Sequence, residues 1–237
     1  DYLAPAQQLA QRLSLQFKQI ARHHFPDGET KITLPSGLPE RVIICQTLNH
    51  PDQKLIELIL VAQTAREQGV KHITLVAPYL CYMRQDIAFN QGEAVSQKII
   101  GKLLSDYFDA VLTVDPHLHR IQNLSEAIPT EQALALHATT AMSAFIKHNV
   151  ADPVIIGPDE ESMQWVAAMA KPEQWQYSIA NKQRFGDKNV TVTLADINFA
   201  NRNVIIVDDI ASSGRTLEQT VKQLLPAGTN TVICNII

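Results

Sequence analysis

Residues 204–216 read Val-Ile-Ile-Val-Asp-Asp-Ile-Ala-Ser-Ser-Gly-Arg-Thr, and this stretch decides the fold. Its first four residues are β-branched and predict a buried strand, with two adjacent acids, Asp208 and Asp209, at the carboxyl end. A loop of small residues follows, and a helix is predicted from Thr216 to Leu225. Such a strand–loop–helix unit is typical of open α/β sheets, which bind ligands at the carboxyl edge of their strands.

The loop after Asp209 has the composition of a phosphate site. Backbone N–H groups of the loop and of the helix N-terminus can hold an anion, and Ser212, Ser213 and Thr216 add hydroxyl donors. The two acids cannot bind that phosphate, because like charges repel, but they suit sugar hydroxyls or hydrated Mg²⁺. A phosphorylated sugar would satisfy both ends. The plainer interpretation is a capped strand end with a solvated acid pair.

The same alternation of strands and helices runs along the whole chain. Strands are predicted at 41–45, 72–76, 110–114, 154–157, 190–194, 204–207 and 231–237, and helices at 51–68, 95–104, 131–148, 161–170 and 216–225. Strands that alternate with helices imply parallel sheets with right-handed crossovers. We therefore predict an α/β fold of two similar lobes, residues 1–138 and 139–237. Because the chain stops within an apolar strand, we expect the second lobe to continue beyond it.

Composition argues against several other classes of protein. The 237 residues are 46% hydrophobic, which is enough for a core, and carry a formal net charge of −4, which disfavours general nucleic-acid binding. Three cysteines without a CxxC pair indicate a reduced, cytoplasmic chain without a disulfide framework. No apolar run reaches the roughly 18 residues of a membrane helix, so no membrane partner is expected.

Residues 204–216 resemble the phosphoribosyl pyrophosphate (PRPP) motif that phosphoribosyltransferases share with PRPP synthetases. Further segments resemble synthetase motifs in the family's order: Phe-Pro-Asp-Gly-Glu at 25–29, Tyr-Met-Arg-Gln-Asp at 82–86, Glu-Ala-Val-Ser-Gln-Lys at 93–98, Asp-Pro-His-Leu-His at 115–119, Pro-Asp at 158–159 and Asn-Lys-Gln-Arg at 181–184. The chain is thus similar throughout to the ribose-phosphate pyrophosphokinase family. That similarity implies two phosphoribosyltransferase-like lobes, each a mostly parallel sheet flanked by helices, with the active site between them.

The resemblance also implies an activity and a set of site residues. The activity is ribose-phosphate diphosphokinase, which transfers pyrophosphate from ATP to C1 of ribose 5-phosphate to give PRPP and AMP. Mg²⁺ is the implied metal, and a homo-oligomer is the implied assembly, with ATP on the N-terminal lobe and ribose 5-phosphate on the C-terminal lobe. The implied ATP residues are Phe25, Asp27, Glu29, Arg84, Gln85, Asp86 and His117; the ribose 5-phosphate residues are Asp208, Asp209, Ser212, Ser213, Gly214, Arg215 and Thr216; the catalytic residues are Lys182, Arg184, Arg84 and His117; the metal ligands are His117 and Asp159.

Each of the other matching sites has a plainer interpretation when it is taken alone. Pro-Asp-Gly is strong turn chemistry, and isolated charged residues are usually solvated. The plainer set is a turn at 25–29, a surface arginine at Arg84, a helix N-cap at Asp159, and surface charge at Lys182 and Arg184.

Four positions depart from the family's pattern. His119 has no clear counterpart, and with His117 it forms an H-x-H pair that could bind zinc, although no cysteine lies nearby in sequence. Glu160 and Glu161 follow the metal aspartate, where the family has small residues, and Arg215 likewise replaces a small residue in the phosphate loop. We expect Glu160 to point outward, as an ordinary acid in a first helical turn.

Two other functions stay open on the sequence alone. A salvage phosphoribosyltransferase that uses PRPP would share residues 208–216 but need neither the adenine loop nor the segment with Lys182 and Arg184. A non-catalytic regulatory subunit related to PRPP synthetase should have lost its catalytic cations, and their presence argues against it. The acid at Glu160 keeps the regulatory alternative open.

Overall fold

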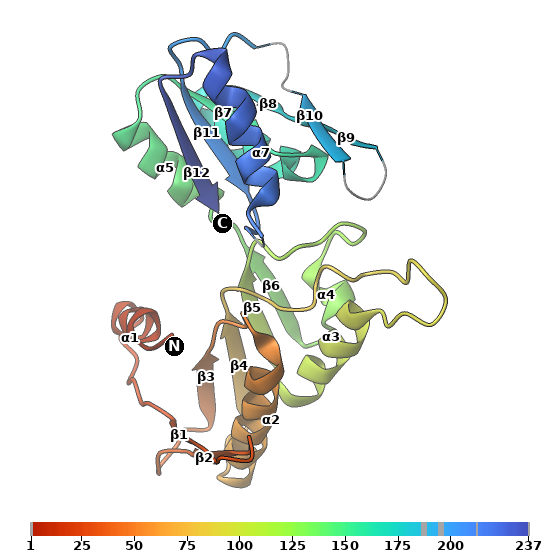
Figure 1. Cartoon of the computed structure of the whole chain (residues 1–237). Coiled ribbons are helices and arrows are strands. Elements are labelled where there is room, and N and C mark those ends of the chain that lie inside the picture. Colours follow the sequence, from red (N-terminus) through yellow and green to blue (C-terminus); the bar gives the residue numbers. More distant parts are fainter. Residues whose placement is uncertain (1, 186–188, 194–196, 212, 237) are drawn as a thin grey trace. The chain divides into compact units, whose positions relative to one another are not determined.

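The computed structural model describes residues 2–185, 189–193, 197–211 and 213–236 (Figure 1). The chain divides into two compact units, Asp1–Leu136 and His137–Ile237, here called the N-terminal and C-terminal units. Each unit contains a four-stranded sheet in which every neighbouring pair of strands is parallel. The predicted α/β fold is therefore confirmed.

The N-terminal unit is organised around the sheet β3-β4-β5-β6. Its strands are β3 (Arg41–Cys45), β4 (His72–Ala77), β5 (Ala110–Val114) and β6 (Gln132–Leu136), and its helices are α1 (Leu3–Arg12), α2 (Pro51–Glu67), α3 (Ser96–Tyr107) and α4 (Leu124–Ala127). Helix α2 begins at Pro51, whose fixed φ suits a first turn, and ends just before Gly69 at φ +93°. Its apolar face packs with Ile73 and Leu75 of β4 in one core.

A short antiparallel hairpin precedes this sheet in the chain. It consists of β1 (Ala21–His24) and β2 (Thr30–Thr33), and every residue of β1 is exposed. Arg22 on β1 forms an ion pair of 2.9 Å with Glu57 of α2, and the Gln53 side chain, also on α2, lies 2.9 Å from the ring of His24. These polar contacts attach β1 to α2, while Ile32 of β2 packs against the N-terminal core.

The C-terminal unit is built on the sheet β12-β11-β7-β8. Its strands are β7 (Pro153–Gly157), β8 (Gln176–Ile179), β11 (Asn203–Asp208) and β12 (Thr231–Ile236), with an antiparallel hairpin of β9 (Asn181–Phe185) and β10 (Asn189–Thr193). Its helices are α5 (Thr139–Asn149), α6 (Met163–Glu173) and α7 (Arg215–Leu224), with the 3₁₀ turns η1 (Glu160–Ser162) and η2 (Leu225–Ala227). No helix in the described part of either unit is long and apolar enough to cross a membrane.

The two central strands, β7 and β11, contribute to cores on both faces of their sheet. Ile155 and Ile205 pack in the cluster that contains Trp165 of α6. Their chain neighbours, such as Ile156 and Ile206, pack in the other cluster, which contains Leu224 of α7. Successive side chains of a strand point to opposite faces, so helices on both faces require a continuous apolar run. This explains the sequences PVIIG and VIIV of the two strands.

One long helix predicted from the sequence is wrong. Residues 131–148 were expected to be helical, but β6 occupies Gln132–Leu136 and α5 starts only at Thr139. Alanine and leucine favour helices by propensity, yet β5 pairs with all five residues of β6 in parallel. Ala133 and Ala135 also pack against the N-terminal core, so an alternating pattern and strand pairing outweigh the local preference.

A glycine sets the distance between α3 and α4. A Cβ atom at Gly101 would overlap the backbone carbonyl oxygen of Ala127, which cannot swing away as a side chain would. Alanine gains about 1 kcal/mol over glycine in helix propensity, but overpacking costs about 1–3 kcal/mol, and a backbone clash lies at the upper end. We expect Gly101→Ala to lower Tm by about 3–8 °C in differential scanning calorimetry.

The matched control is Lys98→Ala, which changes an exposed position of the same helix. Surface substitutions usually stay within about 0.5 kcal/mol, so this variant should melt close to the parent protein. A Gly101→Ala protein that melts at or above the parent temperature would contradict the packing derived for α3 and α4.

Candidate functional site

Three carboxylates gather at one edge of the C-terminal sheet, and we call Asp159, Asp208 and Asp209 the acidic edge. Asp159 follows β7, whereas Asp208 ends β11 and Asp209 follows it. The two strands pair in parallel, in register from Asn203 opposite Pro153 onward. Their carboxyl ends therefore lie side by side, and the acids that follow them share an edge of the sheet.

Burial and mutual repulsion shape the electrostatics of the acidic edge. Asp209 is only 9% exposed, and its backbone N–H donates a hydrogen bond of 3.1 Å to the Asp208 carboxylate. Burial raises the pKa of Asp208 to about 7, and the charges of Asp209 and Asp159 push it in the same direction. The charged form of Asp208 is therefore disfavoured in the free protein, and a cation or hydroxyl donors bound beside it would stabilise that form.

One carboxylate oxygen of Asp159 lacks a hydrogen-bond partner among the described residues. Its Oδ1 atom is buried and accepts no hydrogen bond from the described residues. Its backbone carbonyl accepts a hydrogen bond of 2.6 Å from the hydroxyl of Ser162, which ties down the start of η1. The two acids that depart from the family's pattern, Glu160 and Glu161, are both exposed. The acidic edge thus offers oxygen atoms that could ligate a hard divalent cation such as Mg²⁺.

The loop after β11 leads into the N-terminus of α7. This helix starts at Arg215, one residue earlier than predicted, and Gly214 before it has φ +71°, a left-handed conformation that favours glycine. The Ser213 hydroxyl accepts a hydrogen bond of 3.4 Å from the backbone N–H of Arg215. Arg215 is exposed and Thr216 is half-buried. Ser212 lies outside the described residues. The helix N-terminus offers N–H groups and a partial positive charge to an anion.

In the N-terminal unit, residues 25–29 form the turn of the β1–β2 hairpin. The Phe25 N–H donates 2.8 Å to the Glu29 carbonyl, and the Glu29 N–H donates 3.1 Å to a carboxylate oxygen of Asp27. Gly28 has φ +94°, so the predicted turn chemistry is confirmed. The Phe25 side chain is 41% exposed, with its ring edge-on to His23 at 4.6 Å between centroids.

The 84–86 segment exposes one charge and buries another. Arg84 is exposed and Gln85 half-buried, whereas only 3% of the Asp86 side chain is exposed, and it accepts a hydrogen bond of 2.6 Å from Arg120. Burial by itself would raise the pKa of Asp86, but the hydrogen bond and charge of Arg120 outweigh it, so the pKa lies below its ordinary value. Sequence analysis missed Arg120, because no local pattern links it to a residue 34 positions away.

His117 and His119 follow β5 and contact each other directly. Their rings are edge-on, with centroids 3.9 Å apart, and a hydrogen bond joins their Nε2 atoms. Asp115, at the start of this segment, is buried and has φ +37°. Burial is the largest influence on the pKa of Asp86 and raises it. Arg120 lowers that pKa, and the charge of His119 lowers it further. The structure therefore brings the 82–86 and 115–119 motifs together.

The remaining predicted residues, Lys182 and Arg184, lie on β9. In backbone register they pair with Val192 and Val190 of β10. The polar stretch that contains them is therefore a strand, which the sequence pattern did not predict. Their side chains fall outside the part of the chain that the structure describes.

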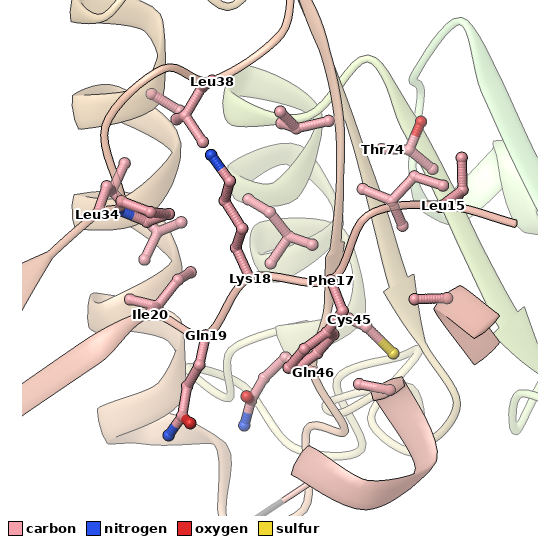
Figure 2. Close-up of a pocket in the computed structure, with 18 of the residues that line it drawn as sticks. Leu15, Phe17, Lys18, Gln19, Ile20, Leu34, Leu38, Cys45, Gln46 and Thr74 are labelled. Atoms are coloured by element: carbon pink, nitrogen blue, oxygen red, sulfur yellow. The ribbon is translucent and has the colours of Figure 1, made fainter. Parts of the chain in front are cut away.

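A separate cavity of about 600 Å³ lies in the N-terminal unit (Figure 2). It borders α1, the segment 15–20, β3 and α2, and its lining is mainly apolar. Helix α1 buries none of its own residues, which leaves room beside β3. Residues predicted to bind ATP or ribose 5-phosphate do not line this cavity, so its size does not mark it as their site.

Comparison with known proteins identifies the family. Residues 3–107 match the model of the N-terminal domain of ribose phosphate pyrophosphokinase, and residues 125–237 match the phosphoribosyl transferase domain. A ribose-phosphate pyrophosphokinase from Saccharolobus solfataricus is 33% identical over 94% of this chain and 77% of its own length. One from Methanopyrus kandleri is 28% identical over the same shares. The chain therefore belongs to the ribose-phosphate pyrophosphokinase family.

A solved structure supports the fold independently. Phosphoribosylpyrophosphate synthetase from Mycobacterium smegmatis superposes with a TM-score of 0.81 at 20% identity. The match covers 96% of this chain and 75% of that one. The resemblance inferred from residues 25–29, 82–86, 115–119 and 204–216 is thereby confirmed at the level of family and fold.

The crowding of the acidic edge has a consequence for stability. Because the pKa of Asp208 is raised to about 7 in the folded protein, the unfolded chain loses this proton at lower pH than the native state does. Stability should therefore fall as pH rises between about 4 and 7. Asp208→Asn removes this cost, so we expect the variant to have a higher Tm than the parent protein at pH 8, with the difference shrinking at pH 5.

Thermal melts at both pH values test this expectation. Glu160→Gln is the matched control, since it removes an exposed acid from the same edge and should alter Tm little at either pH. A pH-independent difference between the Asp208→Asn variant and the parent would show that Asp208 has an ordinary pKa.

Proposed function

We propose that this protein is a ribose-phosphate diphosphokinase, a transferase of nucleotide biosynthesis that converts ATP and ribose 5-phosphate into PRPP and AMP. The observation that carries the proposal is the acidic edge, placed beside a glycine-capped helix N-terminus. Partly or fully buried acids and an anion site together match a sugar that bears hydroxyls at one end and phosphate at the other. Family membership supplies the reaction, and the match of residues 3–107 favours it over salvage transfer from PRPP.

On this proposal the C-terminal unit holds ribose 5-phosphate. Asp208 and Asp209 accept hydrogen bonds from the ribose hydroxyls, and the loop that leads into α7 holds the 5-phosphate. The N–H groups at the start of α7 suit that phosphate because the positive end of the helix dipole lies there. The phosphate donors are assigned to residues 212–216, namely Ser212, Ser213, Gly214, Arg215 and Thr216. We take residues 139–237 as this domain.

Residues 1–138 are the ATP domain of the proposal. The exposed ring of Phe25 offers a stacking surface for adenine, and Asp27 and Glu29 flank it on the hairpin turn. Arg84, with an exposed guanidinium, and His117 are assigned to the phosphates. Gln85 joins them, while Asp86 faces Arg120 and supports this segment from beneath.

Mg²⁺ fits the residues present. The unpartnered Oδ1 of Asp159 and the raised pKa of Asp208 both mark an excess of carboxylate oxygen, which is the ligand chemistry of Mg²⁺. We propose Asp159 as its ligand on this unit and His117 as the residue nearest the nucleotide-bound ion. The bound ion would supply charge neutralisation for the polyphosphate.

The reaction needs no protein nucleophile. The C1 hydroxyl oxygen of ribose 5-phosphate attacks the β-phosphorus of ATP, the bond from that phosphorus to the bridging α–β oxygen breaks, and AMP leaves with that oxygen. The hydroxyl proton passes to solvent or to a nearby base. Catalysis is then positioning and charge stabilisation, which we assign to Lys182, Arg184 and Arg84. We further propose a cytoplasmic homo-oligomer.

The direct test supplies the purified protein with ATP, Mg²⁺ and ribose 5-phosphate. We expect AMP and PRPP to accumulate in equal amounts, measured by ion-exchange chromatography, because one transfer produces both. Asp208→Asn combined with Asp209→Asn should abolish turnover and weaken ribose 5-phosphate binding in calorimetry. Release of ADP in place of AMP, or near-normal sugar binding by the double variant, would overturn the proposal.

Lys182 and Arg184 are expected to act on the chemical step. If they stabilise charge that develops in the transition state, Lys182→Ala and Arg184→Ala should each lower kcat by about 10²–10³ while KM for ATP changes little. Lys171→Ala, which removes an exposed cation from α6, is the matched control and should keep parental kinetics. Unchanged kcat with raised KM would make these residues binding groups instead.

A further inference from the structure

The His117–His119 pair is a cluster that the proposed reaction does not fully use. The family pattern accounts for His117 alone, yet the two rings meet edge-on and their Nε2 atoms share a hydrogen bond. In that contact one ring donates its Nε2 proton to the lone pair of the other. Two Nε2 atoms, each able to ligate a metal, are therefore directly adjacent.

Buried acids of the same unit lie near the pair. Both histidines lie within five residues of the end of β5, a central strand of its sheet, and Asp115 before them is buried. Asp86 lies close enough for its charge to interact with His119, and its Oδ2 atom is buried and accepts no hydrogen bond from the described residues. A cation that replaced the shared proton, with a small separation of the two rings, would meet two imidazole nitrogens near a buried carboxylate.

We propose that His117 and His119 form a two-imidazole site for a borderline transition metal such as Co²⁺, Ni²⁺ or Zn²⁺. Imidazole nitrogen suits these ions, whereas Mg²⁺ prefers oxygen and keeps its waters. Both rings bind through Nε2 as neutral imidazoles, so the ring that donates its Nε2 proton in the free pair takes its other tautomer, with one proton on Nδ1 and none released overall. Water fills the open positions of the metal, and an oxygen of a nucleotide phosphate can replace it.

The site would give this chain a metal preference of its own. With ATP bound as in the proposed function, a transition metal on the histidine pair would meet the polyphosphate with two nitrogen ligands already in place. The contact between this metal and ATP rests on the proposed function, but metal binding to the substrate-free protein does not. Experiments can therefore contradict the metal site and the proposed function separately.

The test uses substrate-free, full-length protein titrated with CoCl₂ in an isothermal calorimeter, with the visible absorption of Co²⁺ recorded in parallel. We expect one Co²⁺ per chain at this site and at least a tenfold loss of affinity in both His117→Ala and His119→Ala. His148→Ala, which removes an exposed histidine from the last turn of α5, is the matched control and should bind Co²⁺ as the parent does. Mg²⁺ affinity should be unchanged in His119→Ala.

A second readout identifies the ligating atoms. In long-range ¹H–¹⁵N spectra of the histidine rings, diamagnetic Zn²⁺ should shift the Nε2 resonances of His117 and His119 and leave that of His148 in place. Equal Co²⁺ affinity in His119→Ala and parent, absent Co²⁺ binding, or Zn²⁺ shifts confined to His117 would each overturn the site. Loss of PRPP formation with intact Co²⁺ binding would instead count against the proposed function alone.

Discussion

The crowding of three carboxylates at the ends of two buried strands is the constraint on which the C-terminal unit depends. β7 and β11 are held by neighbouring strands and by cores on both faces, so their ends cannot separate to relieve the repulsion. Asp208 consequently carries a pKa raised to about 7 by burial and by its acidic neighbours. A proton, a cation or hydroxyl donors can relieve this repulsion. A ligand that supplies them therefore binds favourably at the acidic edge.

In the N-terminal unit, a turn and an ion pair hold the candidate polar residues. The 25–29 turn owes its shape to Asp27 and Gly28, whose backbone contacts leave the ring of Phe25 exposed. At the edge of the sheet, the Asp86–Arg120 ion pair holds the segment that exposes Arg84. Each unit has a parallel sheet with helices. The C-terminal unit gathers carboxylates that repel one another, whereas the N-terminal unit pairs Asp86 with Arg120 beside its exposed Arg84.

Sequence predicted what depends on local pattern and missed what depends on distant pairing. The strands β7 and β11 could be predicted because strands buried on both faces need continuous apolar runs, and the acids after β11 stood out against that run. The strand β6 could not, since Gln-Ala-Leu-Ala-Leu also suits a helix and only its pairing with β5 decides. The short, exposed β1 has no apolar pattern at all. The raised pKa of Asp208 comes first from burial and from Asp209, and strand register adds the charge of Asp159, which no local pattern reveals.

The most direct measurement of this account is the titration of the Asp208 carboxyl carbon by ¹³C NMR, assigned with Asp208→Asn. Its pKa should be about 7 in the free protein, against an ordinary value of 3.8. It should fall when Mg²⁺ and ribose 5-phosphate are added, because a cation and hydroxyl donors favour the charged form. A pKa near 3.8 that does not respond to these ligands would contradict the claim that the acidic edge is charge-crowded and built to receive them.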